Sequence, residues 1–283
     1  MSALFFTIIC STSIALILKY NNTRGGNPLL LLSANYAVAA TISFLLIYSN
    51  EESVFSLESL AFGALLALGF VFSFFAFAKA VGAAGAALAT VSSRLSMIVP
   101  LILSMLIFRE HPSRIQSAGI AAAMMTIVLF YFSLKNDGTR QLHFMDYLYL
   151  GGVLMGIGFN DFAMKVFQDW RPQAEKPFFM FVIFSGAFFI SVLMVWLKKI
   201  PLDKNVILRG SILGIPNMFS TFFMLLALSL LPAIVVYPLT NIGIILFTAI
   251  GARLIWKERL NRYGKLALIS GILAIALLSL PEF

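Results

Sequence analysis

The stretch Phe72-Ser-Phe-Phe-Ala-Phe-Ala-Lys-Ala80 decides the fold, because it returns about 147 residues later as Phe219-Ser-Thr-Phe-Phe-Met-Leu-Leu-Ala227. Two more matches lie at nearly the same offset. Phe108–Glu110 corresponds to Trp256–Glu258, and Ile14–Lys19 to Asn160–Lys165. Three matches in one order indicate a duplicated unit. In a membrane chain an internal repeat is typical of transporters that bind their substrate between the two repeats.

The composition predicts an all-α integral membrane protein. The chain is 60% apolar and 11% charged, whereas an average soluble domain is about 25% charged. A helix that crosses a bilayer needs about 20 mainly apolar residues. Ten such stretches are predicted, over residues 2–19, 28–48, 58–79, 84–108, 113–133, 146–168, 177–197, 208–231, 233–255 and 263–280.

Ten helices and one duplication give five helices in each half. Because five is odd, the second half enters the membrane from the opposite side, which predicts two inverted repeats. The predicted domains are residues 1–135 and 136–283. The single cysteine, Cys10, excludes an intrachain disulfide and a multi-cysteine metal cluster, and no cofactor is expected.

The net charge of +8 reflects topology rather than nucleic-acid binding, because membrane loops concentrate Lys and Arg on one side. With Arg94 set aside as intramembrane, fourteen of the remaining nineteen basic residues fall on the side shared by loops 1–2, 3–4, 5–6, 7–8 and 9–10. This count places both termini outside the cytoplasm.

Two motifs resemble the hallmark of the drug/metabolite transporter superfamily, EamA type. The first runs from Val99 to Glu110 and continues through Gln116–Gly119; the second is Tyr237–Glu258, followed by Gly264 and Gly271. Each has a Pro early in a long apolar helix, a Glu at its end and a glycine-containing helix after a short turn. The resemblance covers the whole chain. It implies a carrier of small metabolites in a bacterial or archaeal plasma membrane. It also implies termini in the cytoplasm, against the charge count, so orientation stays open.

Arg94 is the strongest candidate for a functional residue. It lies about ten residues into the fourth predicted helix. An arginine at that depth costs at least about 2.5–3.5 kcal/mol on insertion scales and normally faces a cavity or a partner. Its planar fork suits a carboxylate or a phosphate. The alternative is a structural arginine that pairs with Asp161 or with broken backbone.

Neutral polar side chains in other helices extend this predicted substrate site. At the repeat offset Asn241 falls opposite Arg94, so one wall carries a cation and the other an amide. For serines near Arg94, close packing of helices is the competing explanation. The predicted substrate-binding set is Arg94, Ser93, Asn35, Tyr36, Tyr237, Asn241 and Asn217.

Asp161, Lys165 and Lys19 form a predicted coupling or ion-pair set. Asp161 is the only acid well within a predicted span, where it is suited to proton coupling. Lys165 lies four residues on, which is equally suited to a structural pair. Lys19 ends a helix and is expected to snorkel to the interface. Glu110 and Glu258, by contrast, are expected in a solvated loop network.

These residues favour a secondary carrier of a small anionic or zwitterionic solute, such as an amino-acid-like metabolite, acting by alternating access as a monomer or homodimer. Multidrug cation efflux is the alternative, although the first helix has no acid and Arg94 repels cations. An enzyme is not expected, because the chain has no His-Glu-x-x-His or Gly-x-Ser-x-Gly motif. The expected partners are the bilayer and a small-molecule substrate.

Overall fold

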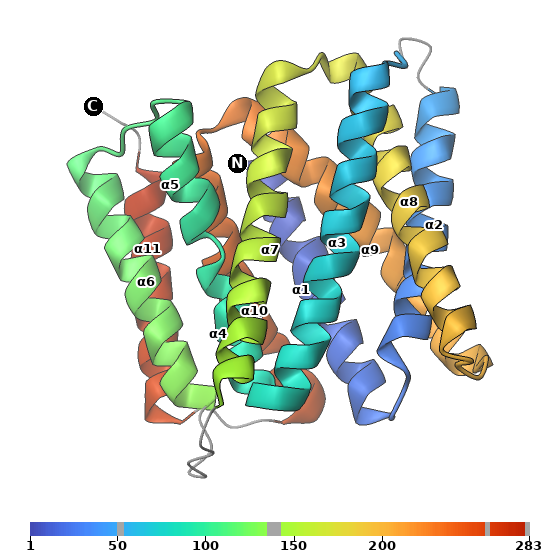
Figure 1. Ribbon diagram of the computed structural model, residues 1–283. Coiled ribbons are helices and arrows are strands. Elements are labelled where there is room, and N and C mark those ends of the chain that lie inside the picture. The colour runs from blue at the N-terminus through green and yellow to red at the C-terminus, as the bar shows by residue number, and fades with distance from the viewer. Residues whose placement is uncertain (50–53, 135–142, 258–260, 281–283) are drawn as a thin grey trace. The chain divides into compact units, whose positions relative to one another are not determined.

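The computed structural model describes residues 1–49, 54–134, 143–257 and 261–280. These residues are overwhelmingly helical, with no strand among them (Figure 1). The elements are α1 (Ser2–Thr23), α2 (Pro28–Ser49), α3 (Leu57–Ala84), α4 (Ala86–Leu95), α5 (Ile98–Ile107), α6 (Arg114–Leu134), α7 (Phe144–Trp170), the 3₁₀ turn η1 (Gln173–Glu175), α8 (Lys176–Leu197), α9 (Lys204–Leu230), α10 (Ala233–Trp256) and α11 (Arg262–Ser279).

Over the described ranges, ten helical segments are long and apolar enough to cross a membrane. They follow the ten predicted stretches to within a few residues. The pair α4 and α5 supplies one of them, from Leu88 to Ile107, and η1 together with α8 supplies another. The chain therefore has the features of a multi-pass membrane protein.

Side-chain caps begin several of the helices. Asn27 Oδ1 accepts hydrogen bonds from the backbone N–H groups of Leu29 and Leu30, which open α2. Asn261 Oδ1 accepts from Gly264 N at 2.9 Å and opens α11 in the same way. An acceptor at this position satisfies N–H groups that the first turn of a helix leaves without partners.

The fourth predicted span is interrupted at Ser96 and Met97, between α4 and α5. The cause is Pro100, which has no N–H to donate and whose ring crowds the carbonyl four residues earlier, at Ser96. The backbone tightens there into turns in which Met97 N donates to Arg94 O and Val99 N to Ser96 O. Pro216 and Pro238, in contrast, lie inside the continuous helices α9 and α10.

The helices are grouped into two compact units, one of residues 1–71 and 166–227 and the other of residues 72–165 and 228–283. Each unit takes segments from both predicted halves of the sequence. The predicted boundary between residues 135 and 136 lies outside the described residues.

In the first unit, α2 packs along α8 (Figure 1). Small residues let the other helices approach closely: a Cβ on Gly214 of α9 would lie 2.6 Å from the carbonyl oxygen of Asn35. The rings of Phe167 and Phe179 stack with their centroids 3.6 Å apart. Close packing of this kind is the main source of helix association in membranes.

In the second unit, α6 packs along α11 (Figure 1), and a Cβ on Gly119 would lie 2.7 Å from Leu278 Cγ. A cluster of small buried residues joins α3, α4 and α7, consisting of Ala76, Ala80, Ala89 and Val153. This cluster fixes the helix that carries Arg94.

Candidate functional site

Arg94 lies in the last turn of α4, where the helix dipole favours a cation. About one turn before the interruption at Ser96, α4 is anchored to α7 by Ser92, whose Oγ donates to Leu150 O at 2.6 Å. The neighbouring Ser96 Oγ donates to Ser93 O at 2.6 Å. The hydroxyl contacts of Ser92 and Ser96 are therefore to backbone, while Ser93 contributes its carbonyl.

The guanidinium of Arg94 faces Asn241 of α10, with 3.5 Å between Nη1 and Oδ1. Asn241 Nδ2 donates to Tyr237 O at 3.1 Å, so its oxygen is left to face the cation. Asn241 is buried and Arg94 is partly buried. This contact agrees with the prediction that Asn241 lies opposite Arg94.

Tyr237 and Asp161 complete the surroundings of Arg94. Tyr237 is fully buried, and its hydroxyl donates to the backbone oxygen of Asp161. This bond ties α10 to α7. Asp161 is partly buried and within electrostatic range of Arg94. Among the described residues, however, no direct ion pair joins the two groups.

Arg94 and Asp161 are thus opposite charges with few protein partners. A guanidinium has five N–H donors, and in the described parts of the chain the one hydrogen bond of Arg94 is the long contact to Asn241. Charges with few partners inside apolar helices are costly, so the surroundings of Arg94 and Asp161 are the candidate site.

Lys165 forms an ion pair with Glu110, whose Oε1 lies 3.0 Å from Nζ. The side chains of Lys165 and Glu110 are only 8% and 11% exposed. Glu110 also accepts hydrogen bonds from the first N–H groups of α10, those of Ala233 (3.1 Å) and Ile234 (3.0 Å). The expectation of a solvated Glu110 is wrong, because the helix end and Lys165 stabilise its carboxylate in a buried position. Glu258 lies outside the described residues.

The remaining predicted site residues belong to the first unit, so nothing places them beside Arg94. Asn35 is 1% exposed, and its Oδ1 has no hydrogen-bond partner within the described ranges. Tyr36 is buried with its ring 6.5 Å from that of Phe184. Asn217 and Lys19 are partly exposed.

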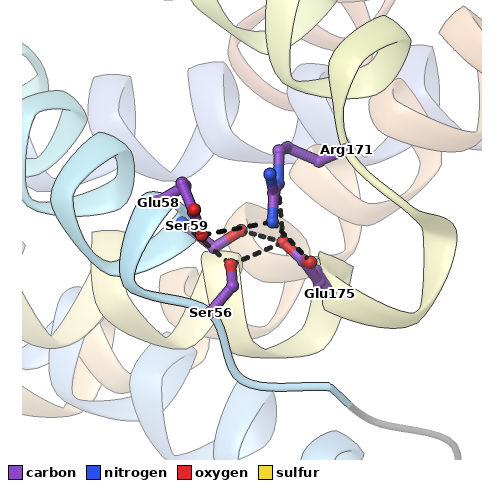
Figure 2. Close-up of polar contacts among 5 residues, drawn as sticks. All are labelled: Ser56, Glu58, Ser59, Arg171 and Glu175. Carbon is purple, nitrogen blue, oxygen red and sulfur yellow. Dashed lines mark hydrogen bonds and ion pairs between the residues drawn. The ribbon is translucent and has the colours of Figure 1, made fainter.

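The first unit also holds a polar cluster at the α7–α8 connection (Figure 2). Arg171 Nη2 lies 2.7 Å from Glu175 Oε1, and its Nε donates to Oε2 at 2.9 Å. Ser56 and Ser59 at the start of α3 donate to Glu175 Oε2, and exposed Glu58 lies 3.5 Å from Arg171. The hydrogen bonds to Glu175 raise the pKa of Arg171 above its ordinary value. Hydrogen bonds within the cluster engage both carboxylate oxygens of Glu175. The cluster is therefore structural, and it ties the start of α3 to the α7–α8 connection.

Lys176 is the first residue of α8. In the sequence analysis it is one of the basic residues counted only to assign the sides of the membrane. It is 8% exposed, and within the described chain the one hydrogen-bond acceptor of its ammonium is Leu225 O at 3.4 Å. The burial of Lys176 was not predicted, because the nearby charged residues Arg171 and Glu175 indicate a loop. Its burial depends on contact with α9, which is distant in sequence.

Comparison with known proteins supports the fold but gives no information on activity. No protein-family model matches the chain. An uncharacterised protein of Haemophilus influenzae is 28% identical, over 97% of this chain and 96% of its own length. One solved crystal structure superimposes with a TM-score of 0.80 at 14% identity, covering 98% of this chain and 95% of that one. The chain therefore shares its fold with a protein of known structure.

Proposed function

We propose that the protein is a secondary carrier of the EamA type, which moves a small zwitterionic or anionic metabolite across a bacterial plasma membrane by alternating access. The observation that carries the proposal is the incompletely paired Arg94, set within a membrane span beside Asn241. Intramembrane charges of this kind mark substrate or ion pathways.

The relation between Arg94 and Asp161 favours a solute with both charges. The two groups interact electrostatically without direct contact among the described residues. A solute with a carboxylate for Arg94 and an ammonium for Asp161 would supply the missing partner of each. An amino-acid-like molecule has this chemistry.

Contacts between residues about 147 apart support the inverted repeat. Arg94 meets Asn241 at a separation of 147, and Ser270 Oγ donates to Ala122 O at a separation of 148. Repeat-related positions touch only near the axis that relates them. The proposed substrate site therefore lies on this pseudo-two-fold axis, as in other carriers built from inverted repeats.

Asp161 is the proposed coupling residue, because it is the carboxylate near Arg94 that has no direct ion pair in the described part of the chain. Lys165 is assigned to positioning α10 through Glu110. Multidrug cation efflux is the alternative within the same superfamily, and Arg94 opposes it because a guanidinium repels a cation. An enzymatic role is not proposed.

A thermal-shift screen of the purified protein tests the proposal, because a ligand that binds only the folded state raises its apparent stability. The panel contains amino acids, organic acids, sugar phosphates and lipophilic cations. Arg94→Gln is compared with Arg253→Gln, which removes the same charge from an exposed position of α10. We expect Arg94→Gln to weaken binding roughly 10- to 150-fold, since a hydrogen bond to a charged group contributes about 1.5–3 kcal/mol.

Asp161→Asn separates the two solute classes. A zwitterion loses affinity in this variant, whereas a pure anion does not, because the carboxylate repels it. Stabilisation of the wild type and of Arg94→Gln by lipophilic cations alone would refute the proposal and favour multidrug efflux.

A further inference from the structure

Two guanidinium groups converge on one aromatic ring at the C-terminal end of α1. The Cζ atoms of Arg24 and Arg209 each lie 5.4 Å from the ring centroid of Tyr20. Arg24 follows α1, whereas Arg209 belongs to the first turns of α9, so the arrangement joins distant parts of the first unit. Each contact is within the range of a cation–π interaction.

The backbone around this ring is fixed by Asn21, which is 2% exposed. Asn21 Oδ1 accepts from Arg209 Nη1 at 3.3 Å, and its Nδ2 donates to Gly26 O at 3.0 Å. The turn between them needs glycine twice: Gly25 has φ +66°, and a Cβ on Gly26 would lie 2.1 Å from Asn21 Oδ1. The turn therefore fixes the backbone at Arg24, whose N donates to Asn21 O at 3.1 Å, and Asn21 contacts Arg209 directly.

Among the described residues the two cations lack a carboxylate counterion. Neither Arg24 nor Arg209 has an ion pair with a carboxylate in the portion of the chain that the structure describes. Their Cζ atoms are separated by at most twice their distance from the ring, which is close to the screening length of about 8–10 Å at physiological ionic strength. Their repulsion is only partly screened, so an anion bound beside them is favoured.

Apolar side chains beside Arg209 indicate where such an anion comes from. Leu208, Ile212 and Ile215 are 60%, 50% and 49% exposed. Their spacing places them along one face of α9, which continues from Arg209 into the membrane span. A lipid whose headgroup lies at the two arginines would place its acyl chains along this face.

We propose that Arg24, Arg209 and Tyr20 form a binding site for the phosphate of an anionic phospholipid. Arginine forks bind phosphate oxygens bidentately, and basic groups at the ends of membrane helices bind anionic headgroups. Phosphatidylcholine is a poorer ligand, because its own ammonium neutralises the phosphate and is repelled by the two guanidiniums. This site is independent of the substrate site at Arg94.

The experiment is a titration of the delipidated full-length protein with dioctanoyl phosphatidylglycerol, followed by native mass spectrometry and by thermal shift. Dioctanoyl phosphatidylcholine and inorganic phosphate are the comparison ligands. The variant Arg24→Gln/Arg209→Gln is matched with Lys204→Gln/Lys265→Gln, which removes the same charge from exposed positions. We expect the arginine variant to bind phosphatidylglycerol at least about tenfold more weakly, as the loss of charge-assisted hydrogen bonds predicts, and the lysine variant to bind like the wild type.

A second variant, Arg24→Lys/Arg209→Lys, retains the charge and the topology but removes the forks. Weaker binding in this variant supports the site even where the glutamine variant fails to fold. Equal binding in both arginine variants and in the wild type would overturn the proposal, as would equal affinity for phosphatidylcholine. An arginine-dependent response to inorganic phosphate as large as that to phosphatidylglycerol would overturn the assignment to a lipid.

Discussion

Replacing Glu110 by alanine removes one carboxylate from three partners at once. Glu110 caps α10 through Ala233 and Ile234 and neutralises Lys165 at 3.0 Å. Loss of a capping side chain costs about 0.5–2 kcal/mol, and removal of one partner of a buried ion pair costs about 3–5 kcal/mol. Effects that share one side chain are not additive. We therefore expect Glu110→Ala to lower the free energy of unfolding by about 3–5 kcal/mol.

A double-mutant cycle with Lys165→Met tests the reasoning, with unfolding followed by circular dichroism in mixed micelles of a mild detergent and dodecyl sulfate. The double variant no longer carries an unpaired buried ammonium, so its deficit should fall to the cap alone, about 0.5–2 kcal/mol. Glu58→Ala is the control, because that carboxylate is 69% exposed and a surface ion pair contributes about 0–1 kcal/mol. An additive cycle would refute a direct coupling between Glu110 and Lys165.

Further predictions concern burial and close packing and use the same unfolding measurement. Lys176→Met should raise the free energy of unfolding by about 1–4 kcal/mol, because an apolar side chain replaces a buried ammonium that has a single weak acceptor; a loss of stability would contradict this view of Lys176. Gly158→Ala should lower it by about 1–3 kcal/mol through overpacking, since the new Cβ would lie 2.8 Å from Ser96 O. Gly151→Ala in the same helix meets nothing within 4 Å and should be neutral or gain up to about 1 kcal/mol; equal effects of the two glycine substitutions would contradict the packing argument.

The ten long apolar helices were predictable because each depends only on a local run of apolar residues. The contact between Arg94 and Asn241 could also be predicted, since the two positions are separated by the repeat offset. The interruption after Arg94 lies several residues before Pro100, because the proline ring crowds the carbonyl of Ser96, one turn earlier.

The buried pairs could not be predicted in this way. Glu110 follows α5 and Lys165 lies near the end of α7, so local sequence places both near water. The burial of Glu110 depends on α10, more than 120 residues later in the chain. The division into two units has the same origin. It is decided by which faces pack, such as Gly214 against Asn35, and no single segment carries that information.

The interleaving of the two units has a consequence for biosynthesis. The first unit needs residues 1–71 and 166–227, and the second needs residues 228–283 in addition to 72–165. Proteins with sequential domains fold from the N-terminus as translation proceeds at about 5–20 residues per second. Here neither unit has all its helices before residue 227 has been made. The early helices therefore remain without their packing partners until the later helices have been synthesised.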